Sequence, residues 1–392
     1  MASERAYWLA WTKIKDVGPV TIKRLWEHFG ELAIAWQASA SDLLLVDGIG
    51  LLSAEKIVRQ RPMLDPEEIL TKHEQENRSF WTPADPDYPS LLFAINDPPP
   101  VLYYRGKFRL NDPNLLTVGI VGTRRPSAYG KRWTQRLSRG LTEQGATIIS
   151  GLAAGIDTEA HTSCLNQQGR TVAVMGTGVD RVYPARNQSL YAQVVETGLV
   201  ISEYPDGTGP DRTHFPQRNR VIAGLSRAIL VTEAPARSGA LITARLANEY
   251  CREVYALPSS LDNSQGEGCL RIIDQGAQII LSEQSLVEAL AGLPSVDAEI
   301  NQPALKTALD RSASKVSGSK ILGSEAPQST KPLPELTPLL SQVLNAVSVE
   351  PVMLDRIVQS AEVDTGAVLG ALVQLEISGL VVQLPGMQYQ RC

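Results

Sequence analysis

Cysteine, histidine and long apolar runs are scarce in this sequence. The four cysteines lie far apart and form no C-x-x-C pair, so they indicate neither a disulfide framework nor a zinc site. The four histidines are equally scattered, and we expect no metal ion and no cofactor. No stretch reaches the ~18 uncharged apolar residues of a membrane span, and the first residues lack the apolar core of a signal peptide. These absences favour a cytoplasmic protein without a membrane partner.

Arginine is unevenly distributed along the chain. The net charge of −5 at first argues against a nucleic-acid partner. Residues 111–290, however, hold 17 basic and 17 acidic residues, and 16 of the basic ones are arginine, Lys131 being the exception. Arginine presents a planar fork that binds phosphate with two hydrogen bonds and stacks on bases. This bias favours nucleic-acid binding. The base composition of the genome is the alternative cause, although residues 1–110 use lysine and arginine freely.

The length of 392 residues and the hydrophobic content of 43% predict a globular protein of two or three domains. Residues 1–80 are predicted to be helical, because apolar side chains recur at helical spacing. Two glycine-containing turns, Asp16–Val20 and Asp47–Gly50, lead into the basic helices Thr21–Arg24 and Ala54–Arg59. The pattern is typical of paired helix-hairpin-helix elements, whose turn amides bind DNA phosphate, and equally of a small helical bundle.

Short apolar runs alternate with longer helical stretches in residues 81–290. Each run is β-rich and uninterrupted, as expected for strands buried on both faces. The predicted strands are Leu115–Val121, Thr147–Ile149, Thr171–Met175, Leu199–Ser202, Ile229–Thr232 and Val254–Leu257. Helical segments such as Lys131–Glu143 and Ser238–Tyr250 lie between them. This order predicts the α/β class, with a Rossmann-like, doubly wound and mostly parallel sheet.

The C-terminal region divides into a polar connection and a helical unit. Residues 291–334 are rich in proline and serine and are predicted to be a flexible linker. Residues 335–392 resume helical periodicity and close with a predicted hairpin, Gly379–Tyr389. Three helices and a wing indicate a winged-helix domain. Its acidic side chains favour contact with protein over contact with DNA.

Several glycine-containing loops follow the predicted strands. In a doubly wound sheet, loop amides and helix N-termini at the carboxyl ends of the strands attract anions. The loop Gly119–Gly130 has the spacing G-x-x-G and carries Arg124, so it does not fit the G-x-G-x-x-G dinucleotide fingerprint. In Arg212–Arg220, three arginines surround Phe215, which suits the phosphates and free bases of an unpaired strand. Alternatively, Phe215 belongs to the core and Arg218 pairs with a carboxylate.

Together the loops predict one groove for a polyanion. In this groove, loop amides and arginine forks neutralise phosphates, while the aromatic ring stacks against a base. The candidate DNA-binding residues are Gly122, Thr123, Arg124, Ser150, Gly151, Arg212, Phe215, Arg218, Asn219, Arg220, Ser238 and Gly239.

The motifs, in this order, resemble the DNA-processing protein A (DprA/Smf) family. The matching pieces are Gly122–Arg124 with Ser127 and Tyr129–Gly130, Ser150–Asp157 with His161, Ser202–Glu203, Phe215–Ile222 and Ser238–Thr243. Upstream, Tyr88–Pro89 and Asp97–Tyr103 are similar to the family's entry into its Rossmann-like domain. The resemblance is strong over residues 85–285 and looser in the terminal domains.

This resemblance implies a protein that binds and protects single-stranded DNA and forms a homodimer through its Rossmann-like domain. It also implies loading of the RecA recombinase onto incoming strands in natural transformation. The family's phosphate-binding arginine falls on Arg124 and its base-contacting aromatic on Phe215, and a family lysine is replaced by Arg212, which keeps the charge. The sequence departs from the family's usual serine, arginine and glycine at Thr123, Ala154 and Ser259.

An enzyme is the main alternative, namely a nucleotide or nucleoside-phosphate hydrolase on a related Rossmann-like fold. Asp157 and His161 share a predicted helix face as an acid and a base would, and Glu203 and Glu233 lie at strand ends. No Walker motif, metal cluster or activated nucleophile accompanies them, so we expect no catalysis. Asp157 is more simply a helix cap. A pure interaction scaffold is the third possibility, and it predicts unchanged DNA affinity when Arg124 is replaced.

Overall fold

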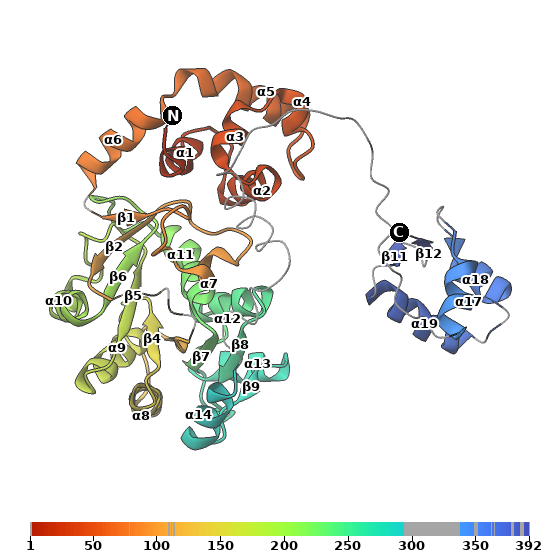
Figure 1. The fold of residues 1–392 in the computed structure, drawn as a ribbon. Helices are drawn as coiled ribbons and strands as arrows, with labels where there is room; N and C mark the ends of the chain where they lie inside the picture. The colour runs from red at the N-terminus through yellow and green to blue at the C-terminus, as the bar shows by residue number, and fades with distance from the viewer. Residues whose placement is uncertain are drawn as a thin grey trace. The chain divides into compact units, whose positions relative to one another are not determined.

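The computed structural model describes residues 2–293, apart from 78, 109, 111 and 113, and residues 338–391, apart from 349–351, 362, 364, 378–379 and 385–387. The chain falls into two compact units, Met1–Val316 and Ser317–Cys392, and each is described by itself (Figure 1). Most of the predicted linker, 291–334, lies outside the described residues. None of the described helices has the length and apolar character needed to span a membrane.

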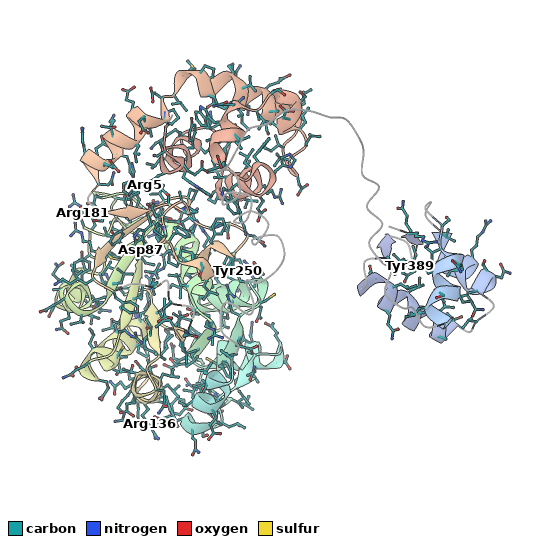
Figure 2. All side chains as sticks on the ribbon, viewed as in Figure 1. Arg5, Asp87, Arg136, Arg181, Tyr250 and Tyr389 are labelled. Atoms are coloured by element: carbon teal, nitrogen blue, oxygen red, sulfur yellow. The ribbon has the colours of Figure 1, made fainter. Side chains whose placement is uncertain are left out.

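Short helices form the N-terminal part of the first unit, as the apolar periodicity predicts. They are α1 (Glu4–Trp11), α2 (Pro19–Phe29), α3 (Leu32–Gln37), α4 (Ala40–Leu43), α5 (Leu51–Gln60), the 3-10 turn η1 (Arg61–Met63) and α6 (Pro66–Glu76). Their core contains the buried Trp8, Trp11 and Leu25. The Arg5 guanidinium, labelled in Figure 2, donates a hydrogen bond to the Phe80 carbonyl at 2.9 Å and so joins the helices to the sheet.

The two predicted hairpins bind each other. The helices that follow them, α2 and α5, each begin after a glycine N-cap. The guanidinium of Arg24, on α2, donates to the carbonyl of Asp47 at 3.1 Å, in the turn before α5. The ammonium of Lys56, on α5, lies 2.7 Å from the carboxylate of Asp16, in the turn before α2. Each basic helix therefore contacts the other hairpin's turn, and these two cations are engaged within the helical part.

Nine strands of the first unit form one sheet, in the order β1-β2-β6-β5-β4-β3-β7-β8-β9. The strands are β1 (Phe80–Trp81), β2 (Leu102–Gly106), β3 (Thr117–Gly122), β4 (Thr147–Ser150), β5 (Thr171–Met175), β6 (Leu199–Ser202), β7 (Ala228–Glu233), β8 (Glu253–Ala256) and β9 (Gln278–Ile279). All pairs from β6 to β9 are parallel, whereas β1 and β2 add an antiparallel edge. The predicted Rossmann-like, mostly parallel sheet is confirmed.

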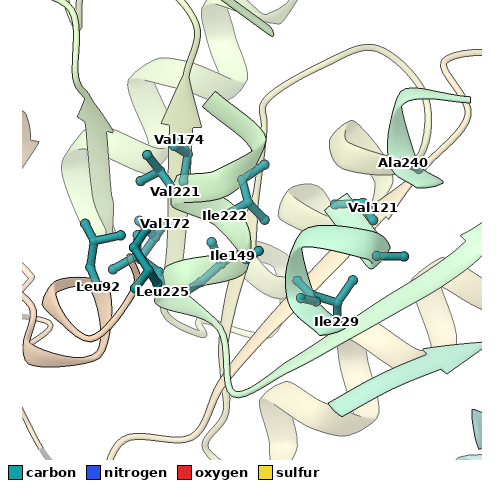
Figure 3. Packing of buried hydrophobic residues seen from close by; sticks show 14 of the residues in the cluster. Leu92, Val121, Ile149, Val172, Val174, Val221, Ile222, Leu225, Ile229 and Ala240 are labelled. Atoms are coloured by element: carbon teal, nitrogen blue, oxygen red, sulfur yellow. The ribbon is translucent and has the colours of Figure 1, made fainter. Parts of the chain in front are cut away.

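Helices cover both faces of this sheet (Figure 1). One face packs against α8 (Ala128–Glu143), α9 (Ile156–Asn166), α10 (Gln188–Thr197), which follows the 3-10 turn η2 (Ala185–Asn187), and α14 (Glu283–Ala291). The other packs against α7 (Ser90–Phe93), α11 (His214–Leu225), α12 (Gly239–Glu249) and α13 (Glu267–Asp274). Neighbouring residues of β3 belong to different cores: Ile120 to the core that includes α8 and α9, and Val121 to the core that includes α11 and α12, where it lies near Ala240 (Figure 3). Burial on both faces is why the strands are uninterrupted apolar runs.

The winding of the chain reverses at β3. From β3 the chain continues through β4, β5 and β6 on one side, and then returns to β7, which pairs with β3 on its other side. The loops that leave β3 and β7 therefore diverge at the carboxyl edge of the sheet. Such a switch point is where doubly wound sheets bind their ligands.

The second unit contains three helices and a small sheet among its described residues. They are α17 (Pro338–Ala346), β10 (Val352–Met353), α18 (Leu354–Ala361), α19 (Thr365–Ile377), β11 (Val381–Leu384) and β12 (Gln388–Arg391). The strands pair antiparallel in the order β10-β12-β11, and Val343, Ile357, Val368 and Leu372 form the core. The predicted winged-helix domain is confirmed, with the two-residue strand β10 as an addition to the prediction.

Candidate nucleic-acid interface

A hollow of about 560 Å³ opens at the switch point between β3 and β7. A second hollow of about 310 Å³ shares Arg124, Ala153, Tyr183, Phe215 and Arg218 with it, and we call the two together the cleft. The predicted loops therefore meet on one concave surface. The candidate residues that line the cleft are Gly122, Thr123, Arg124, Gly151, Arg212, Phe215, Arg218, Asn219, Ser238 and Gly239.

Main-chain hydrogen bonds hold the loop that follows β3. The Thr123 amide donates to the Glu233 carbonyl at 2.7 Å, and the Ile156 amide donates to the Thr123 carbonyl at 3.1 Å. A Cβ at Gly122 would lie 2.5 Å from Cγ1 of Ile156, so glycine is needed for close packing of β3 against α9. The Thr123 amide is therefore engaged within the framework. The exposed side chains of this loop that line the cleft are those of Arg124 and Arg125.

Glu233 supports the same loop from the end of β7. Its side chain is 1% exposed, and its carboxylate accepts hydrogen bonds from the Ser127 amide at 2.7 Å and the Ser127 hydroxyl at 2.6 Å. Ser127 is the N-cap of α8, because its oxygen also accepts from the Gly130 amide at 3.2 Å. This strand-end carboxylate thus fixes the start of α8, and it does not line the cleft.

Arg218 belongs to the floor of the cleft and is only 4% exposed. Its guanidinium donates to the Gly151 carbonyl at 2.7 Å and also to the Val174 carbonyl. Burial lowers the pKa of Arg218 to about 10. Burial also raises the pKa of the neighbouring Asp157, an effect that the charge of Arg218 opposes. Arg218 therefore positions the ends of β4 and β5 beneath the cleft.

Two predicted residues lie outside the cleft. The buried Ser150 hydroxyl donates to the Ile120 carbonyl at 2.6 Å and so joins β4 to β3. Arg220, on α11, forms a close ion pair with Glu203 and lies 3.5 Å from the carboxylate of Asp97. Both residues act in the framework, since Ser150 connects strands and Arg220 anchors α11.

The start of α12 supplies the opposite wall. The Ser238 hydroxyl accepts from the Ala240 amide at 3.3 Å and caps the helix. The Asn219 side chain donates to the Gly239 carbonyl at 3.2 Å, which ties α11 to this wall. A Cβ at Gly239 would have no atom within 4 Å, so the wall is open here.

Two aromatic rings and an arginine meet in the cleft. The ring centroids of Phe215 and Tyr183 are 5.4 Å apart, with planes inclined by 36°. The Cζ of Arg124 lies 5.4 Å from the Phe215 centroid, over the ring. The Phe215 ring packs closely against the backbone at Gly176, after β5. A Cβ at this position would lie 2.9 Å from the ring, so glycine is needed here. Tyr183 is 43% exposed, so an aromatic surface beside a cation faces solvent.

Among the lining residues outside the predicted set are three arginines and an aromatic ring: Arg125, Arg186, Arg237 and Tyr183. The sequence does contain a signal for two of them. Tyr183 and Arg186 follow the predicted strand Thr171–Met175 and combine an aromatic ring with an arginine, as Arg212–Arg220 does. Together with Arg124 and Arg212, the three new arginines give the cleft five exposed cations.

Asp157 and His161 have separate partners. The Asp157 carboxylate accepts from the amides of Gly151 and Ala153 at 3.0 and 3.3 Å, as a loop cap does. His161 is fully buried with Nδ1 2.7 Å from the Thr171 hydroxyl, and burial lowers its pKa to about 3. Asp157 is the one carboxylate among the residues that line the cleft. Within the described parts of the chain, no group of three His, Cys, Asp or Glu side chains is placed to hold a metal ion.

Comparisons with known proteins agree over nearly the whole chain. The profile of DNA recombination-mediator protein A matches residues 79–291, and that of the DprA winged helix domain matches residues 327–387. Protein Smf of Synechocystis sp. is 49% identical over 396 residues, which cover 99% of this chain and 99% of that protein.

Streptococcus pneumoniae provides a second relative and a solved structure. Its DNA processing protein DprA is 41% identical over 218 residues, which cover 56% of this chain and 76% of that protein. The X-ray structure of DNA processing protein A from this species aligns with a TM-score of 0.62 and 32% identity, over 75% of this chain and 99% of that one. The chain therefore belongs to the DNA-processing protein A (DprA/Smf) family, as its ordered loop motifs predict.

Proposed function

We propose that the chain binds single-stranded DNA in the cleft. The proposal rests on the paired rings of Phe215 and Tyr183, with the Arg124 guanidinium over Phe215. Unpaired bases have free faces that stack on aromatic side chains, whereas the bases of a duplex stack on one another. Membership of a family whose profile is described as a DNA recombination mediator supports the same function.

The proposed contacts come from side chains that line the cleft. Phosphates bind the arginine forks, and bases stack on the two rings without regard to sequence, because every base has a π-face. Asn219 and Ser238 add hydrogen-bonding groups on the far wall. Of the candidates predicted from sequence, Ser150, Arg218 and Arg220 support these contacts from the framework. The proposed phosphate-binding residues are Arg124, Arg125, Arg186, Arg212 and Arg237.

Binding without bond-making chemistry is part of the proposal. Five arginines spread over two adjoining hollows suit a polyanion better than one mononucleotide. The buried, neutral His161 and the amide-bonded Asp157 are poorly placed for general acid–base catalysis, which needs groups within reach of a substrate.

Homodimerisation and delivery of the strand to a RecA recombinase, in the cytoplasm and during natural transformation, complete the proposed role. Two copies would present two clefts to one strand and raise avidity through effective concentration. Resemblance to the DprA/Smf family supports this part. The test is the rate at which RecA filaments form on single strands coated with a single-stranded DNA-binding protein. We expect the chain to increase this rate, and an unchanged rate would contradict the proposed role.

The central test is fluorescence anisotropy of a labelled single-stranded oligonucleotide, with and without excess duplex. Binding should resist the duplex, and Arg124→Ala should lose about 1.5–3 kcal/mol, or about 10- to 150-fold in Kd. Arg245→Ala is the control, because Arg245 is exposed and does not line the cleft. If wild type does not bind, or if Arg124→Ala binds as tightly as the control, the proposal fails.

A further inference from the structure

A second basic surface lies on α8, outside the cleft. The helix contains four basic residues and one acidic residue, Glu143, at its last position. Arg132, Arg136 and Arg139 line a hollow of about 310 Å³ between α8 and α9. Figure 2 labels Arg136 at the lower edge of the first unit. The lining residues contributed by α9 and its C-cap are uncharged and polar: Thr162, Ser163, Asn166 and Gln167. We call this surface the α8 face.

The spacing of the three arginines places them on one side of the helix. Residues three and four positions apart lie on the same helical face. The rise of 1.5 Å per residue places Arg132 about 8 Å, and Arg139 about 18 Å, along the axis from the N-cap Ser127. Ser127 directly follows the loop of Arg124 and Arg125, both of which line the cleft. The α8 face therefore begins beside the cleft and leads away from it.

Neighbouring side chains orient the guanidinium groups of Arg136 and Arg139, but their ion pairs are exposed and weak. Arg136 lies 3.3 Å from Glu283, and Arg139 lies 3.8 Å from Glu143, as exposed ion pairs of a kind that contributes little to stability. The Arg136 guanidinium also lies 4.8 Å from the Trp133 ring centroid. An arginine held against a ring loses less side-chain entropy when it binds an anion.

The order of charges along α8 is unfavourable for an isolated helix. The first turn has no acidic residue, and Lys131 and Arg132 follow close behind it. The positive end of the helix dipole disfavours cations near the N-terminus. A bound polyanion would offset this repulsion, whereas an ordinary solvated face would favour acidic residues here.

From these observations we propose that the α8 face is a second contact for single-stranded nucleic acid and holds the strand that leaves the cleft. The inference rests on the proposed function, because the strand reaches α8 from the cleft. The phosphates of the emerging strand bind Arg132, Arg136 and Arg139, and the hydroxyl and amide groups of α9 donate hydrogen bonds to it.

Strand length separates the two sites. An oligonucleotide of about 6 nucleotides is short enough to occupy the cleft alone, and one of about 25 nucleotides is long enough to continue over α8. The test variant is Arg132→Gln/Arg136→Gln/Arg139→Gln. The control is Lys72→Gln/Arg245→Gln/Arg271→Gln, which removes the same charge from three exposed residues that also have i,i+4 ion pairs. Circular dichroism melting confirms that both variants are folded.

We expect the α8 variant to bind the long strand at least about tenfold more weakly and the short strand as tightly as wild type. The slope of log K against log salt for the long strand should decrease by about 2, since three phosphate contacts at about 0.7 each are lost. A long-strand affinity and slope equal to those of the control overturn the inference, as does equal weakening for both lengths. If Arg124→Ala still weakens both lengths, the proposed function stands without the α8 face. If wild type binds neither strand, both fail.

Discussion

Replacing Arg218 should lower the stability of the protein. Any loss of DNA binding should follow from that loss of stability and not from the loss of a direct DNA contact. The guanidinium is 4% exposed and bonds to two carbonyls, at the ends of β4 and β5. Arg218→Ala would leave those carbonyls without this donor and would remove the cation that offsets the buried carboxylate of Asp157. Removing one member of a buried charged pair costs about 3–5 kcal/mol. For a domain of this size, the expected decrease in Tm is about 10 °C.

The assay combines thermal melting and urea unfolding with anisotropy measured well below the Tm. Arg124→Ala is the matched comparison, because its exposed side chain should change DNA affinity and leave the Tm within about 1 °C. The double variant Arg218→Ala/Asp157→Asn should be less destabilised than the sum of the single variants, by about 0.5–3 kcal/mol, since the uncompensated carboxylate is gone. An Arg218→Ala protein with wild-type stability and lost DNA affinity would refute the reasoning and make Arg218 a direct DNA contact.

Three further predictions concern the rings, the loop glycines and a buried histidine. Tyr183→Ala should weaken single-strand binding by about 1–3 kcal/mol in anisotropy, and Tyr183→Phe should not; equal losses would exclude stacking. Gly122→Ala should lower the urea midpoint, because its Cβ would lie 2.5 Å from a side-chain carbon, whereas Gly239→Ala has open space and should not; equal midpoints would exclude the packing role. Burial lowers the pKa of His161 from 6.5 to about 3, so the unfolded state takes up the proton first and stability falls as pH drops from about 6.5 towards 3. The urea midpoint of His161→Asn should fall less than that of wild type over this range; parallel curves would contradict the shift.

The fold could be predicted because its strands are buried on both faces. In Thr171–Met175, for example, Val172 and Val174 face one core and Ala173 and Met175 face the other, so the run from Val172 to Met175 is apolar without interruption. The alternation of strands and helices then predicts a parallel sheet with right-handed connections. Once the strands are identified, the loops that follow them lie at the carboxyl edge of the sheet, so these loops could be predicted too. Four strands are absent from the prediction: β1, β2, β9 and β10. Of these, β1, β9 and β10 are only two residues long, and β2 is five residues long and forms an antiparallel pair with β6.

The roles of individual arginines could not be predicted from residue type. Arg212 precedes α11 and is exposed, Arg218 points into the floor, and Arg220 pairs with Glu203. All three arginines lie in one short segment, and the packing of α11 determines which guanidinium group is exposed to solvent. Tyr183 is the converse case: Gly176 and Gly178 mark the start of its loop, and the sequence places an aromatic ring and an arginine after the strand, but nothing in the pattern brings this ring against Phe215.

The switch point also determines when during synthesis the cleft can exist. Ser127 and the Glu233 carboxylate that holds it are 106 residues apart, and β7 reaches β3 only after β4, β5 and β6 have been made. A nascent chain on the ribosome that has not yet released β7 and α12 possesses the Arg124 loop but not the wall that completes the cleft. The proposed affinity for a strand would therefore arise late in translation, and a product that ends before β7 would lack the complete cleft.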